Sequence, residues 1–173
     1  MRSFLYRWLF STFSNEHIFS RYNTTSILLI IAPDIEDFIQ RARVARLATV
    51  GSGFKLHLVP TVFVFDGSHF FIPVDEKRKK AKPENLRRIK NIKGNPNVAL
   101  LIDEYSEDWT RLAFVMIQGM ASVLKSRKQA DIQLRQAQAG LATKYIQYQK
   151  IGIGEMCIMI KPEKVVSWRS SQL

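Results

Sequence analysis

The sequence predicts a mainly β domain, a small antiparallel barrel of six strands with helical caps. Short apolar runs rich in β-branched and aromatic residues recur at close spacing from Ala45 onward. Turns containing glycine separate the first of them, and helical periodicity is confined to the ends and to one crossover. With 173 residues, of which 46% are hydrophobic, the chain is long enough to bury a real core.

Residues 1–33 are expected to form an N-terminal extension, and the barrel domain is expected to span 34–173. The longest apolar run of the extension, Ser26 to Ala32, falls far short of the ~20 residues that a membrane helix needs, so we expect no membrane span. An amphipathic or transit-like segment is one interpretation. We favour a poorly ordered extension or a start codon placed too far upstream.

The segment from Ala45 to Val74 predicts three strands joined by two tight turns, each with glycine where a hairpin needs positive φ. Its middle strand carries a polar notch formed by His57, Pro60 and Thr61. Because proline cannot donate to a sheet ladder, Pro60 indicates an edge strand, a bulge or a strand that crosses a rim.

The other elements follow from helical spacing, from apolar runs and from their breakers. Gly119 is expected to mark a bend or bulge, and Gly140 to weaken the last helix. The predicted helices cover 33–43, 83–93 and 128–148, and the predicted strands cover 97–105, 112–124 and a final strand over 156–168 that is broken at 161–163.

The net charge of +11 is concentrated in one stretch, because residues 76–93 hold nine Lys or Arg and two Glu. One dense patch favours a single anionic partner over a general nucleic-acid coat. Nucleic-acid binding through this stretch is kept as a minor alternative. The single cysteine, Cys157, excludes an internal disulfide framework and favours a reducing, cytoplasmic setting.

The basic run is either a solvated helix face or a phosphate cradle. Cations placed just after a strand, followed by a helix start whose N–H groups attract anions, suit a phosphorylated ligand. Arg88 and Asn91, three residues apart, share a helix face, and asparagine adds directional hydrogen bonds.

Other candidate residues each have a structural interpretation as well. His57 is a strand histidine that serves either as a structural residue or surface donor, or as a catalytic base. Trp109 and Arg111 either anchor a loop or form a wall of a ring-binding site. No nucleophile–base pair, carboxylate pair, metal-ligand spacing or glycine-rich nucleotide loop is evident, so the catalytic residues are not predicted.

Seven short motifs resemble, in order and spacing, the pyridoxamine 5′-phosphate oxidase-like split-barrel family, and more narrowly its F420-dependent oxidoreductases. They are ARLATV, HLVPTVF, FDGSHFFIPVD, the basic run, RIKNIKGNPNVALLID, EDWTRL and KPEKVVSWR. The resemblance covers roughly Asp34 to Arg169. It implies a six-stranded FMN-binding type of split barrel that dimerises, with two cofactor sites at the subunit interface.

The resemblance also implies cofactor-binding residues. The phosphate would be held by Lys77, Lys79, Lys80, Arg88 and Asn91. The flavin or deazaflavin ring would lie near His57, Val59, Pro60 and Thr61. Trp109 and Arg111 would approach the ring from the neighbouring subunit or from the acidic loop of Glu104, Glu107 and Asp108.

The predicted function is an oxidoreductase that passes a hydride between bound F420 or FMN and a small organic substrate. The alternative is a non-enzymatic flavin or deazaflavin carrier, which the lack of an obvious proton-transfer pair keeps open. The extra-basic groove suits the polyanionic tail of F420, but charge alone does not choose between the two cofactors.

Overall fold

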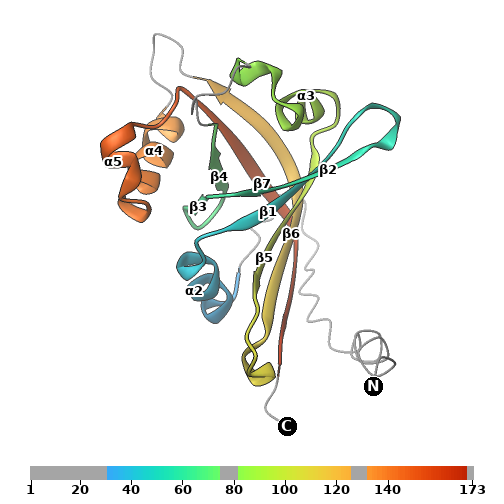
Figure 1. The fold of residues 1–173 in the computed structure, drawn as a ribbon, viewed down its shortest axis with the longest axis vertical. Helices are drawn as coiled ribbons and strands as arrows, with labels where there is room; N and C mark the ends of the chain where they lie inside the picture. Colours follow the sequence, from blue (N-terminus) through green and yellow to red (C-terminus); the bar gives the residue numbers. More distant parts are fainter. Residues whose placement is uncertain (1–30, 75–81, 126–131, 171–173) are drawn as a thin grey trace, which may run out of the picture.

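The computed structural model describes residues 31–74, 82–125 and 132–170, so most of the predicted extension lies outside it (Figure 1). The helical elements are α2 (Pro33–Arg41), η1 (Ser52–Phe54), η2 (Pro83–Asn85), α3 (Arg87–Gly94), η3 (Trp109–Arg111), α4 (Ile132–Lys144) and α5 (Gln147–Ile151). The strands are β1 (Ala45–Val50), β2 (Leu56–Thr61), β3 (Val64–Phe65), β4 (Phe70–Pro73), β5 (Asn97–Glu104), β6 (Ala113–Lys125) and β7 (Met156–Arg169).

Seven strands of the described chain form one antiparallel sheet in the order β2-β1-β5-β6-β7-β4-β3. Its two edge strands, β2 and β3, follow one another in sequence with only Val62 and Phe63 between them. The sheet therefore curls so that the end of β2 comes next to the start of β3, a half-barrel consistent with the split barrel that the sequence predicts. Pro60 lies in the edge strand β2, as its missing N–H group requires.

The prediction of six strands was wrong by one, because the middle strand of the meander is divided into β2 and β3. The break falls at Phe63, whose backbone N–H donates to the hydroxyl of Tyr145 at 3.2 Å. The same hydroxyl lies 2.9 Å from the Phe63 carbonyl oxygen. A side chain thus takes both backbone groups that a continuous ladder would use.

The final strand is continuous from Met156 to Arg169, whereas the sequence predicted a break at residues 161–163. The ladder between β6 and β7 shifts register between Gln118 and Gly119, as the predicted bulge requires. A Cβ on Gly119 would lie 2.2 Å from the carbonyl oxygen of Lys161, so only glycine fits there. The β6–β7 ladder continues on both sides of this register shift, so β7 remains one strand.

The barrel interior is the larger of two cores. Its residues alternate along the strands, with Leu47, Leu100 and Ile117 fully buried. The helices α2 and α3 add their apolar faces to it, through Ile39 and Ile89 among others.

The second core lies between the β3–β4 hairpin and the helices α4 and α5. It includes Val64, Phe71, Leu141 and Cys157. The single predicted helix is two, because α4 ends at Lys144 and α5 begins at Gln147, and the predicted start at Lys128 lies outside the described residues.

Candidate functional site

The candidate site lies where α3 packs against the β1–β2 hairpin, at one end of the barrel (Figure 1). A buried hydrogen bond joins these elements, since the Nδ2 of Asn91 donates to the Oγ1 of Thr49 at 3.0 Å. Thr49 is 1% exposed and Asn91 8% exposed. Across the β1–β2 ladder, Thr49 pairs with His57, which places this histidine directly beside the helix.

Gly51 lets the hairpin approach α3 closely. A Cβ at this position would lie 2.8 Å from the Oδ1 of Asn91, closer than real Cβ contacts allow. The turn is closed by the Gly51 N–H, which donates to the carbonyl of Lys55 at 2.9 Å. The short turn and the buried asparagine together fix how the hairpin sits on the helix.

Three side chains that carry or accept protons gather at the first turn of α3. The pKa of His57 is lowered from its ordinary value by burial and then by the charges of Arg87 and Arg88. His57 is therefore a neutral imidazole at neutral pH, and its Nδ1 atom is buried with no hydrogen-bond partner among the described residues. The first turn of a helix also carries N–H groups without intrahelical acceptors, which attract anions.

The structure brings together some of the predicted site residues. His57, Arg88 and Asn91 lie at the same end of the barrel. Asn91 has a structural partner in Thr49, and its contact with a ligand stays a prediction. The predicted phosphate-binding residues Lys77, Lys79 and Lys80 lie outside the described residues.

The predicted ring-binding residues of β2 divide between two faces of the sheet. His57, Val59 and Thr61 are half-buried and pair with inward-facing residues of β1. Pro60 is exposed and points the other way, as alternation along a strand demands. Leu56 and Leu58, on the same outer face as Pro60, are 79% and 64% exposed.

Trp109 and Arg111 lie far from this site within one chain. They belong to η3, after the end of β5 that is remote from α3 (Figure 1). Arg111 is paired with Glu104 at 3.5 Å, and Trp109 is 57% exposed. Within one chain they therefore do not join His57, Arg88 and Asn91.

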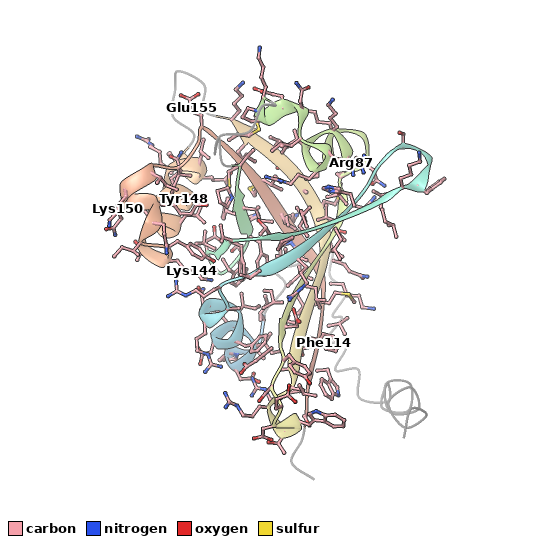
Figure 2. The ribbon with its side chains drawn as sticks, viewed as in Figure 1. Arg87, Phe114, Lys144, Tyr148, Lys150 and Glu155 are labelled. Carbon is pink, nitrogen blue, oxygen red and sulfur yellow. The ribbon has the colours of Figure 1, made fainter. Side chains whose placement is uncertain are left out.

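Arg87 was missed by sequence reasoning. It is exposed, it acts electrostatically on His57, and Figure 2 shows it beside the β1–β2 hairpin. Its signal was the Arg–Arg pair at the predicted helix start. The helical phase alone favoured Arg88, because Arg88 shares a face with Asn91.

A metal-ligand cluster, a membrane-spanning helix and the single thiol are three other features that could indicate function in the described residues. No cluster of three His, Cys, Asp or Glu side chains that could hold a metal ion occurs among them. No helix in the described ranges is long and apolar enough to cross a membrane. Cys157 is buried, and burial raises the pKa of its thiol to about 12.

A curled antiparallel sheet with a cationic helix start beside its first hairpin defines a protein of the split β-barrel class. The chain belongs to the pyridoxamine 5′-phosphate oxidase family, whose model matches residues 31–169. The resemblance to this family stated from the sequence motifs is thereby confirmed, whereas the narrower resemblance to its F420-dependent oxidoreductases stays a prediction. Among curated proteins, no sequence matches the chain.

Solved structures share the fold. HutZ, the heme storage protein from Vibrio cholerae, is 17% identical with a TM-score of 0.60, over 79% of this chain and 92% of its own. A conserved hypothetical protein from Mycobacterium tuberculosis is 17% identical with a TM-score of 0.63, over 86% and 91%. A FAD-binding protein from Mesorhizobium loti is 19% identical with a TM-score of 0.56, over 78% and 89%.

Proposed function

We propose that this protein is a homodimeric oxidoreductase that binds FMN or F420 and acts on a small organic substrate. The observation that carries the proposal is the cluster of Arg87, Arg88 and neutral His57 at the first turn of α3. Membership of the pyridoxamine 5′-phosphate oxidase family supports a flavin-type cofactor. The buried single thiol suits a reducing, cytoplasmic setting.

The residues present fit a phosphorylated cofactor. Arg87 and Arg88 would hold its phosphate, because guanidinium groups form paired, charge-assisted hydrogen bonds with phosphate oxygens. The same phosphate would also be bound by lysines that precede α3 in sequence, Lys77, Lys79 and Lys80. Asn91 would act as a positioning residue that holds α3 on the hairpin through Thr49.

The ring of the cofactor would lie against the inward side of β2. Val59 and Thr61 line that side. The Nδ1 of His57, which has no hydrogen-bond partner among the described residues, would exchange a hydrogen bond with a polar atom of the ring. A neutral His57 leaves the positive charge to the arginines. When bound, a flavin or deazaflavin supplies hydride-transfer chemistry, while the chain supplies binding and orientation.

A homodimer is supported by the outer face of the sheet. Leu101, Met116 and Val166 are adjacent across β5, β6 and β7 and remain partly exposed. Phe114 and Trp168 stack beside them with ring centroids 6.1 Å apart. Burying such a surface against a second copy would also bring the partner's Trp109 and Arg111 toward the first chain's site.

Binding titrations of the purified protein with FMN and with F420 test the proposal. We expect one of them to bind with at least tenfold preference, and the variant Arg87→Gln/Arg88→Gln to lose at least tenfold in affinity. Lys93→Gln is the matched control, because it removes a charge from the exposed last turn of the same helix. If the double variant keeps its affinity for both cofactors, the proposed site is contradicted.

A non-enzymatic carrier is the second candidate function. It is favoured by the absence, in the described part of the chain, of a second proton-transfer group beside His57, and by the fold shared with the heme storage protein HutZ. Tight cofactor binding with no turnover of any enone by the reduced, loaded protein would support this candidate over the enzyme.

A further inference from the structure

A cavity of about 570 Å³ lies at the opposite end of β2 from His57. It is formed where the end of α4 and α5 face the strand break, and it falls in the size range of small-ligand sites. Most of its wall is apolar or aromatic, with two cations at its edge. The lining residues are Arg43, Val44, Val62, Thr143, Lys144, Tyr145, Ile146, Gln147, Tyr148 and Ile151.

Lys144 is an unusual residue for such a wall. Its Nζ is buried, has no hydrogen-bond partner among the described residues, and lies 4.1 Å from the centre of the Phe63 ring. Burial, with a smaller contribution from the charge of Arg43, lowers the pKa of Lys144 to about 8. The cation–π contact offsets only part of the cost of removing an ammonium from water.

Arg43 places a second positive charge beside the first. Its guanidinium donates a hydrogen bond to the carbonyl oxygen of Lys144 and lies 5.6 Å from the centre of the Tyr145 ring. The ion pairs of the described chain are Arg46 with Asp103, Arg111 with Glu104 and Lys125 with Glu84. Neither Arg43 nor Lys144 takes part in one, so no described carboxylate balances their charges.

We propose that this cavity binds a carboxylate with an apolar tail, the carboxylate between Arg43 and Lys144 and the tail against Val62, Ile146 and Ile151. Such an anion would supply the missing hydrogen bonds and charge at once. The flexible lysine stem lets the ammonium turn from the Phe63 ring toward the ligand. Exposed Ile146 and Ile151, at 65% and 57%, would be covered by the tail.

This site is separate from the proposed cofactor site. His57 and Val62 stand five residues apart along an extended chain, which is roughly 16 Å. Figure 2 shows Arg87 beside α3, toward the turn of the β1–β2 hairpin, and Lys144 by the helices at the other end of the hairpin. The inference therefore stands or falls independently of flavin binding.

Calorimetric titration of the full chain with octanoate, and with 1-octanol as its uncharged match, tests the proposal. We expect octanoate to bind at least tenfold more tightly than octanol. Lys144→Met and Arg43→Gln should each weaken octanoate binding at least tenfold. The matched controls Lys150→Met and Arg41→Gln, which change exposed charges on α5 and α2, should stay within twofold of the unaltered protein.

Equal binding of octanoate and octanol, or unchanged binding by the Lys144→Met variant, would overturn the proposal. If Lys144→Met fails to fold, Lys144→Arg replaces it as the test, because it keeps a cation at the site and should retain octanoate binding. A Lys144→Arg protein that binds the cofactor normally but has lost octanoate binding would also count against the site. In the unaltered protein, octanoate should shift the amide NMR signals of Lys144 and Tyr145 and leave that of Lys93 in place. A shift of the Lys93 signal without shifts of the Lys144 and Tyr145 signals would contradict binding in this cavity.

Discussion

The side chain of Asn91 donates a hydrogen bond to the Oγ1 of Thr49 across 3.0 Å, and this buried contact ties α3 to β1. The Thr49 hydroxyl in turn lies 3.4 Å from the carbonyl oxygen of His57 on β2. One polar chain thus runs from the cationic helix through the hairpin. It sets the position of Arg87 and Arg88 relative to His57.

Replacing Asn91 by alanine should destabilise the fold and weaken cofactor binding together. The change removes a buried hydrogen bond, and we expect a loss of about 1–3 kcal/mol in the free energy of unfolding. Urea unfolding measures it, with Asn85→Ala, at an exposed residue of η2, as the control. A fully stable Asn91→Ala protein would show that the contact does not hold the helix.

Gly51→Ala tests the close approach of hairpin and helix. The backbone φ of Gly51 is −94°, so alanine suits the conformation, and the cost comes from the Asn91 Oδ1 at 2.8 Å from the new Cβ. We expect a loss of about 1 kcal/mol as Asn91 is displaced. Gly94→Ala is the control, because a Cβ there meets nothing within 4 Å. Equal stabilities of the two variants would rule out the clash.

Tyr145→Phe tests the origin of the strand break. The hydroxyl accepts from the Phe63 N–H and lies 2.9 Å and 3.0 Å from the carbonyl oxygens of Phe63 and Arg43. Its loss leaves a buried N–H without its partner, so thermal unfolding should show a loss of about 1–3 kcal/mol. Tyr105→Phe, at a residue that is 69% exposed, should change stability by less than about 0.5 kcal/mol.

The pH dependence of stability should reveal Lys144. The folded protein releases the Lys144 proton near pH 8 and the unfolded chain near pH 10.5, so between these values the unfolded state binds more protons. The lysine contribution therefore makes the free energy of unfolding rise with pH across this window. The raised pKa values of Tyr145 and Cys157 act in the opposite direction, so a difference measurement is required.

The comparison is between the unaltered protein and Lys144→Met. Subtracting their unfolding free energies at each pH cancels the tyrosine and cysteine contributions. The difference, unaltered protein minus variant, should rise from pH 8 to 10.5. The total rise should be on the order of 1 kcal/mol, since Lys144 is only partly buried. A flat difference would mean that the ammonium is not desolvated.

Local chemistry predicted much of the fold. The turn glycines, the edge proline Pro60 and the bulge at Gly119 all act through neighbouring backbone, and all lie where the sequence placed them. The break at Phe63 did not follow from local pattern, because its cause, Tyr145, stands 82 residues away. The unbroken final strand was missed for another reason. The ladder pairs Gln118 with Lys164 and Gly119 with Pro162, so the segment at residues 161–163 that was expected to break the strand only places the extra residue Glu163 in a bulge.

The candidate site was predictable in kind more than in detail. The charge run indicated an anion site at the start of a helix, and the structure has cations there. The sequence could not show that Arg87 acts on His57, or that Asn91 is buried against Thr49, because both contacts depend on how the hairpin folds over α3. The Lys144 cavity had no sequence signal, since a lone lysine near a helix end is ordinary.

A comparison of the protein's affinity for FMN with its affinity for riboflavin, which has the same ring and no phosphate, tests the phosphate site at the start of α3. If FMN does not bind, F420 and its phosphate-free deazaflavin core replace them. We expect at least tenfold tighter binding of the phosphorylated form. That preference should disappear in Arg87→Gln/Arg88→Gln and persist in Lys93→Gln. Equal affinities for the two forms in the unaltered protein would contradict a phosphate site at the start of α3.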